Sequence, residues 1–193
     1  MLLDWWEGRK KILDPSGQVK MEEPSLAEYL KVDRQKVREL LNLIAYEAHG
    51  QQAELVGTAD VTEEKLVTGL MRLSQNPEVN PALLVKYLSE RAGLLLPRGV
   101  QVYTFPHRTF QEYLAACHLT DHDYPETLAE LFRQDSNRWR EVLLLAGAKA
   151  AGGSASTIWS LVEALCFRVW QLTGRFQSNF AKHANYSSSD RSI

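Results

Sequence analysis

The sequence predicts a mainly α-helical protein with a small β-hairpin, and three observations support this class. Apolar residues recur three and four positions apart along much of the chain, which is the spacing of an amphipathic helix. Several of these stretches begin with a helix-capping residue, such as Ser25, Asp33 or Asn80. Residues 100–105 are the clearest strand, because they are β-branched and aromatic.

Composition narrows the class of protein further. The 193 residues are 45% hydrophobic and 24% charged, which is typical of a globular chain with a real core. The net charge of −2 gives no overall attraction to nucleic acid or to an anionic membrane. Cys117 and Cys166 are isolated among apolar residues, so we expect both to be buried in a reducing compartment. With no signal-peptide pattern and no long apolar run, we expect a soluble, cytoplasmic protein.

Residues 1–57 are expected to form a helical region. Its first helix is predicted over residues 2–13 and ends at the turn residues 14–17. Ser25 and Glu28 have the spacing of a capping box, in which each side chain binds the other residue's backbone amide. Asp33 then caps a longer helix, with Gly50 as its natural stop.

Residues 58–122 are patterned as helix, small hairpin, helix. Thr62 and the acids after it begin one helix, and Asn80 begins a second that continues to Ala92. A turn at Arg98 and Gly99 leads into the strand of residues 100–105, and the next helix runs from about His107 to Leu119. This order is the plan of a winged-helix domain.

The rest of the chain is expected to add repeat-like helices over 123–173. Apolar faces recur at short intervals, interrupted by the break at residues 152–154, and a last helix is predicted over 156–170. Short helices in succession suggest the start of a HEAT-like repeat array, although no repeated residue pattern is visible. The polar stretch 174–193 is expected to be a disordered tail.

Motifs for catalysis are missing from the sequence. It holds no Gly-x-x-x-x-Gly-Lys-Ser/Thr loop for phosphate, no Gly-x-Ser-x-Gly elbow and no His-Glu-x-x-His zinc helix. We therefore predict no catalytic residues, no metal site and no enzymatic activity in this chain.

One segment stands out, and it carries a family resemblance. Residues 105–116 read Phe-Pro-His-Arg-Thr-Phe-Gln-Glu-Tyr-Leu-Ala-Ala. They resemble the Phe-x-His-x-(Ser/Thr)-Phe-Gln-Glu-Tyr-Leu-Ala-Ala signature of NACHT-family NTPases, which belong to the STAND class of signalling ATPases. The segment 88–95 is also similar to the helix that leads into the family's wing. The resemblance extends over about residues 1–150 and implies a fragment: the C-terminal part of a NACHT module without its P-loop core.

The resemblance assigns a role to His107. In the family the matching histidine contacts the terminal phosphate of bound ADP and holds the inactive state. A helix N-terminus contributes about 0.3–1 kcal/mol to a nearby anion, and one charge-assisted hydrogen bond about 1.5–3 kcal/mol. Micromolar binding needs about 8 kcal/mol, so we expect no cofactor in this chain alone, with ADP or ATP held by the full module. The plainer alternative is that His107 only caps its helix or satisfies a strand carbonyl.

The remaining signature residues are expected to be structural. Phe110, Tyr113 and Leu114 should fill the core, and Arg108 should be a solvated side chain rather than a phosphate ligand. Gln111 and its neighbour Glu112 are expected either to fix the helix through polar contacts or to lie exposed, and the sequence leaves both possibilities open.

Two functions remain. The first is a regulatory and interaction module in NACHT-type signal transduction, including defence signalling, that senses nucleotide state, enforces autoinhibition and controls oligomerisation. Its partner would be a NACHT nucleotide-binding core or further copies of itself, with no nucleic acid or membrane involved. The alternative is a DNA-binding winged-helix regulator that reads DNA with residues 81–92. That helix offers Lys86 and Arg91 against Glu90, and the wing adds Arg98, which is fewer cations than DNA binding normally uses.

Overall fold

The computed structural model describes residues 10–13, 15–84, 95–122, 124–154 and 156–166. The chain divides into two compact units, Met1–Asp121 and His122–Ile193. The strands of the described residues all belong to the first unit, and the second unit is helical over most of its described part.

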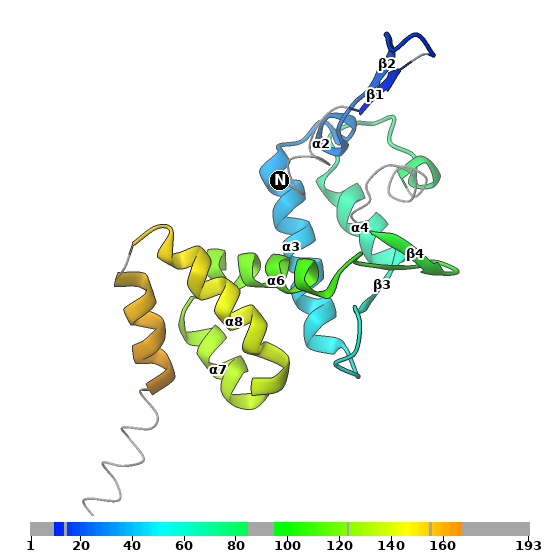
Figure 1. Ribbon diagram of the computed structural model, residues 1–193. Helices are drawn as coiled ribbons and strands as arrows, with labels where there is room; N and C mark the ends of the chain where they lie inside the picture. The colour runs from blue at the N-terminus through cyan, green and yellow to red at the C-terminus, as the bar shows by residue number, and fades with distance from the viewer. Residues whose placement is uncertain (1–9, 14, 85–94, 123, 155, 167–193) are drawn as a thin grey trace, which may run out of the picture. The chain divides into compact units, whose positions relative to one another are not determined.

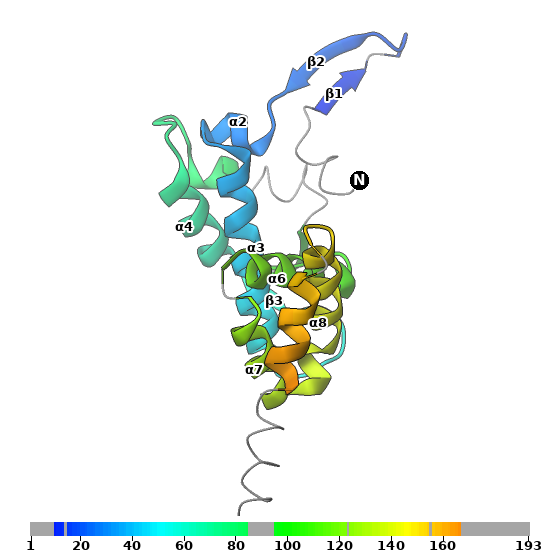
Figure 2. The same cartoon turned by 90° about the vertical axis from the view of Figure 1, so that its left-hand side faces the viewer.

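The described part of the first unit begins with a β-hairpin. Strands β1 (Lys10–Leu13) and β2 (Val19–Glu23) pair antiparallel, and Figure 2 shows them as two arrows. Gly17 in the connecting turn has a φ of +83°, a left-handed conformation that favours glycine. The helix predicted over residues 2–13 is therefore wrong for Lys10–Leu13, while residues 2–9 lie outside the described part. The contrary signal was the apolar–polar alternation in β2, which is the pattern of a strand.

Three helices follow with the predicted N-terminal caps. In α2 (Leu26–Leu30) the capping box of Ser25 and Glu28 is confirmed, with the Ser25 amide 2.8 Å from the Glu28 carboxylate. Helix α3 (Arg34–Gln51) is capped by the Asp33 carboxylate and runs one residue past Gly50. Helix α4 (Glu63–Leu73) is capped by the Thr62 hydroxyl, also as predicted.

A small antiparallel sheet lies beside these helices. Its strands are β3 (Asp60–Thr62), β4 (Leu96–Gly99) and β5 (Val102–Thr104), in the order β3-β5-β4. The predicted hairpin is confirmed, but its turn lies at residues 100–101 rather than at Arg98 and Gly99. Gln101 adopts a φ of +59° in that turn. Strand β3 was not predicted, because its three residues are held by pairing with β5, about 40 positions away in the chain.

The order α3, β3, α4, β4, β5 and then α6 (Arg108–His122) confirms the mainly helical class and the winged-helix arrangement (Figure 1). A helical turn at residues 81–84 follows Asn80, whose side chain accepts the Ala82 amide at 2.8 Å. The rest of the helix predicted to Ala92 lies outside the described residues.

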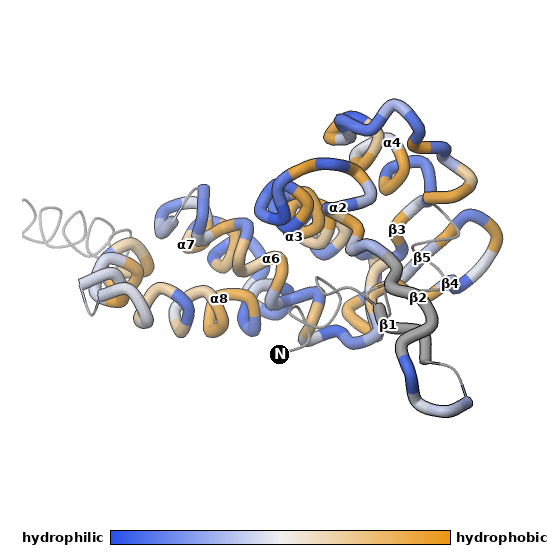
Figure 3. The backbone as a smooth tube through the Cα atoms, turned by 90° about the horizontal axis from the view of Figure 1, so that it is seen from above, coloured by the Kyte–Doolittle hydropathy of each residue, from blue (hydrophilic) through white to orange (hydrophobic). Residues whose placement is uncertain are grey.

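One apolar core joins these elements. Its members come from α2, α3, α4, the sheet and α6, so residues on both sides of position 57 share it, and Figure 3 shows the apolar residues along α3 and α4. The largest side chains that are almost fully buried in it are Leu26, Leu30, Leu41, Ile44, Leu66, Leu70, Leu84, Leu95, Phe105 and Leu114.

The second unit contains α7 (Glu126–Gln134), α8 (Ser136–Ala151) and a helical segment over residues 156–166. The Asp135 carboxylate caps α8 by accepting the Arg138 amide at 3.0 Å. Cys117 of the first unit is buried as expected, whereas Cys166 is exposed, so that part of the prediction is wrong. The expected tail and the last residues of the helix predicted over 156–170 lie outside the described part. Among the described residues, no helix has the length and apolar character needed to cross a membrane.

Candidate functional site

His107 lies where strand β5 passes into helix α6. Phe105, just after the strand, is 1% exposed and meets Phe110 in an edge-to-face contact with ring centroids 6.3 Å apart. This contact fixes the chain on both sides of His107. The His107 carbonyl accepts the amides of Phe110 at 3.1 Å and Gln111 at 3.2 Å, so its backbone opens the helix.

The imidazole of His107 is exposed at this junction. Within the described ranges it makes no hydrogen bond, ion pair or ring contact, and the helix is opened by the backbone carbonyl instead. In the same part of the chain, the amides of Arg108 and Thr109 have no backbone acceptor, as is usual in a first helical turn. The junction therefore presents a free imidazole beside helix-terminal amides, which together favour an anion.

Gln111 is completely buried and fixes a distant loop, residues 52–59, which connects α3 to β3 and is named the anchored loop. The Gln111 side-chain Oε1 accepts the amide of Ala59 at 2.8 Å, and its Nε2 lies 3.2 Å from Nδ1 of the buried His49. Because Oε1 is an acceptor, Nε2 must donate, which assigns Nδ1 of His49 as an acceptor and places that ring's proton on Nε2.

Arg108 and Glu112 form an ion pair that also holds this loop. Arg108 Nε donates to Glu112 Oε1 at 2.7 Å, and the Glu112 side chain is only 5% exposed. Arg108 Nη1 donates to the carbonyl of Leu55. The expectation that Arg108 is solvated is therefore wrong, because its guanidinium spans from α6 to the anchored loop. For Gln111 and Glu112 the structure selects the first alternative, polar contacts that fix the helix.

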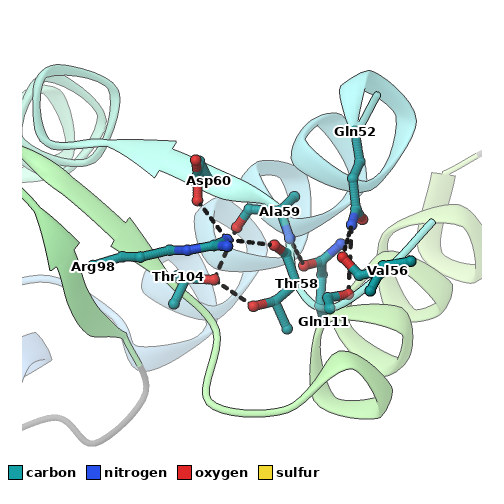
Figure 4. A network of polar contacts seen from close by, with 9 residues as sticks. Gln52, Val56, Thr58, Ala59, Asp60, Arg98, Thr104 and Gln111 are labelled. Carbon is teal, nitrogen blue, oxygen red and sulfur yellow. Dashed lines mark hydrogen bonds and ion pairs between the residues drawn. The ribbon is translucent and has the colours of Figure 1, made fainter. Parts of the chain in front are cut away.

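The sheet holds the other end of the anchored loop, as Figure 4 shows. Arg98 of β4 donates to the Thr58 carbonyl at 3.2 Å and to the Asp60 carboxylate at 3.0 Å. The Thr104 hydroxyl donates to the Ala59 carbonyl at 3.1 Å. Side chains from β4, β5 and α6 thus bind the backbone of one short loop.

Tyr113 does not belong to the core, contrary to the prediction from sequence. Leu114 is fully buried and Phe110 packs against the core, as expected, but Tyr113 is 37% exposed. The nearby Cys117 thiol and partial burial raise the pKa of the Tyr113 hydroxyl. The buried apolar residues of α6 are Leu114, Ala115, Ala116, Cys117 and Leu119, whereas Phe110 is partly buried.

An open groove of about 350 Å³ is lined by residues of α3 and α4. Its lining includes Leu40, Ile44 and Gly69, together with the ion pair of Glu47 with Lys65. No cluster of metal-ligating side chains occurs in the portion of the chain that the structure describes.

Comparison with known proteins identifies the family. Residues 1–119 match the model of the winged helix-turn-helix domain C-terminal to NACHT. The match covers more than half of the chain, so the chain belongs to this family, and the matched residues correspond to the region that follows the NACHT domain. No curated protein and no solved structure matches the chain.

Proposed function

We propose that the chain is a regulatory and interaction module of a NACHT-type signalling ATPase, with His107 as its sensor of nucleotide state. The observation that carries this proposal is the contrast within one helical turn. Arg108, Gln111 and Glu112 are committed to internal contacts, whereas the His107 imidazole between the strand and the helix is exposed.

The chemistry available to His107 is donation of a hydrogen bond to the terminal phosphate of ADP held by a NACHT core, supplied either in trans or within a full-length protein. Such a charge-assisted bond is worth about 1.5–3 kcal/mol, equivalent to roughly a 10- to 150-fold shift between two conformations. When ATP replaces ADP, the contact would break and the winged helix would move as a hinge, exposing surfaces for oligomerisation.

The same energies oppose nucleotide binding by the chain alone. One hydrogen bond and a helix terminus fall well short of the roughly 8 kcal/mol that micromolar affinity requires. DNA binding has little support, because Arg98 of the wing is already engaged by Asp60 and by the Thr58 carbonyl.

The proposal is tested by supplying the core. A NACHT nucleotide-binding core encoded in the source genome, upstream of or near this chain, would be purified and loaded with ADP or with a non-hydrolysable ATP analogue. Calorimetry should show that the chain binds the ADP-loaded core more tightly than the ATP-loaded core. Equal affinity for both, micromolar ADP binding by the chain alone, or the lack of such a core in the genome would overturn the proposal.

A further inference from the structure

The anchored loop carries an exposed apolar residue at a rigid position. Val56 is 83% exposed, although the backbone around it is held by hydrogen bonds. We propose that this loop is a docking element that inserts Val56 into an apolar socket on the nucleotide-binding core. This inference rests on the proposed function and adds the surface through which the core is recognised.

The backbone of the loop is fixed at Val56, which is called its tip. Gln52 Nε2 donates to the carbonyls of Val56 at 3.2 Å and Gly57 at 3.4 Å, and Arg108 donates to the carbonyl of Leu55. The carbonyls immediately before, at and after the tip are therefore all bound by side chains, two by Gln52 at the start of the loop itself and one by Arg108 of α6. A loop fixed in this way loses little conformational entropy when it docks, which is the advantage of a preorganised binding surface.

The loop tip is also connected to the helix start at His107 by one side-chain contact. The residue that follows His107 is Arg108, and its guanidinium binds the carbonyl of the residue that precedes Val56. The Arg108 side chain therefore spans the distance between the start of α6 and the loop tip. On the proposed function, a core that holds a diphosphate at His107 would lie within reach of the loop tip.

The chemistry of the tip favours a protein partner. Its exposed side chains are Ala53, Glu54 and Val56, which include no cation. Such a tip is poorly suited to nucleic acid, whose phosphates are bound by Lys and Arg. It suits a protein surface with an apolar pocket, in which a buried aliphatic side chain can act as an anchor.

The test compares two exposed valines of the same unit. Val56→Asp places a charge at the loop tip, and Val100→Asp places the same charge on the wing turn, where Val100 is 91% exposed. Binding of both variants to the ADP-loaded core would be measured by calorimetry. We expect Val56→Asp to weaken binding about tenfold or more, whereas Val100→Asp should stay within about twofold. Both should melt like the parent chain.

The outcomes separate this inference from the proposed function. If the parent chain does not bind the core, both the proposed function and the docking-loop inference are overturned. If it binds with the expected nucleotide dependence but Val56→Asp has no more effect than Val100→Asp, only the docking loop is overturned. If light scattering shows that Val56→Asp abolishes a dimer of this chain while leaving core binding intact, the loop serves self-association instead and the inference is also overturned.

Discussion

Gln111 and Ala59 are 52 residues apart in the sequence, yet the Gln111 Oε1 accepts the Ala59 amide at 2.8 Å inside the protein. This bond connects the signature helix α6 to the end of the anchored loop. A buried amide that loses its acceptor retains the full cost of desolvation, about 1–3 kcal/mol.

We therefore expect Gln111→Leu to lower the free energy of unfolding by about 1–3 kcal/mol and to speed hydrogen exchange at the Ala59 amide. Denaturant unfolding and exchange measured by mass spectrometry would check both effects. Gln35→Leu is the matched control, because Gln35 makes its hydrogen bond to Glu39 in an exposed position of α3 and should change stability by less than about 0.5 kcal/mol. Equal effects of the two substitutions would contradict the structural role of Gln111.

A second prediction concerns the contribution of the Arg108–Glu112 ion pair to stability. Arg108→Leu leaves the buried Glu112 carboxylate without its partner, so we expect a loss of about 3 kcal/mol or more in unfolding free energy. The double variant Arg108→Leu with Glu112→Leu removes both charges and should recover part of that loss. Denaturant unfolding measures both variants, and a double variant that is less stable than the single one would show that the pair is not the cause.

Tyr113 and Leu114 differ in burial despite being neighbours. Leu114→Ala should lower the unfolding free energy by about 2–5 kcal/mol, because it opens a cavity in the core. Tyr113→Ala should cost less than Leu114→Ala, because the Tyr113 side chain is 37% exposed and lies outside the core. Denaturant titration of the two variants measures both losses of unfolding free energy. A larger loss for Tyr113→Ala than for Leu114→Ala would contradict the placement of Tyr113 outside the core.

Local features of this fold could be predicted from sequence, because they depend on residues close together in the chain. The capping box of Ser25 and Glu28, the cap at Asp33 and the hairpin before α6 are of this kind. Strand β3 could not be predicted, because three residues carry little pattern and its partner lies far along the chain.

In the candidate site, too, some features could be predicted from local sequence and others could not. The position of His107 at the helix start followed from the strand and proline before it. The burial of Gln111 and Glu112 did not, because their partners include the backbone amide of Ala59 and the side chain of Arg108, which also binds the anchored loop. The spacing of Arg108 and Glu112, four residues apart, is a local sign of an ion pair. Nothing local marks the backbone of Leu55 and Ala59 as partners of this helix. The exposure of Val56 was equally hidden, since aliphatic residues are more often buried.

Asp135 predicts how the second unit responds to acid. The Arg138 amide, which donates to this carboxylate, lowers the pKa of Asp135 below the ordinary aspartate value of about 3.9. Stability from a lowered pKa is present above the unfolded value and is lost as pH falls through the folded one. The melting temperature should therefore drop below about pH 4, and the drop should be smaller in Asp135→Asn, which keeps a capping side chain but does not titrate. Identical acid profiles for the two proteins would contradict this assignment.

The proposed function depends above all on His107, whose exposed imidazole would read the nucleotide state of a separate core. The most direct measurement is calorimetric binding of the parent chain and of His107→Ala to the same NACHT core, loaded with ADP or with an ATP analogue. Because the imidazole is exposed and makes no hydrogen bond, ion pair or ring contact among the described residues, His107→Ala should leave the unfolding free energy within about 0.5 kcal/mol. We expect the variant to lose the preference for the ADP-loaded core. A folded variant that keeps this preference unchanged would contradict the role of His107 as the sensor.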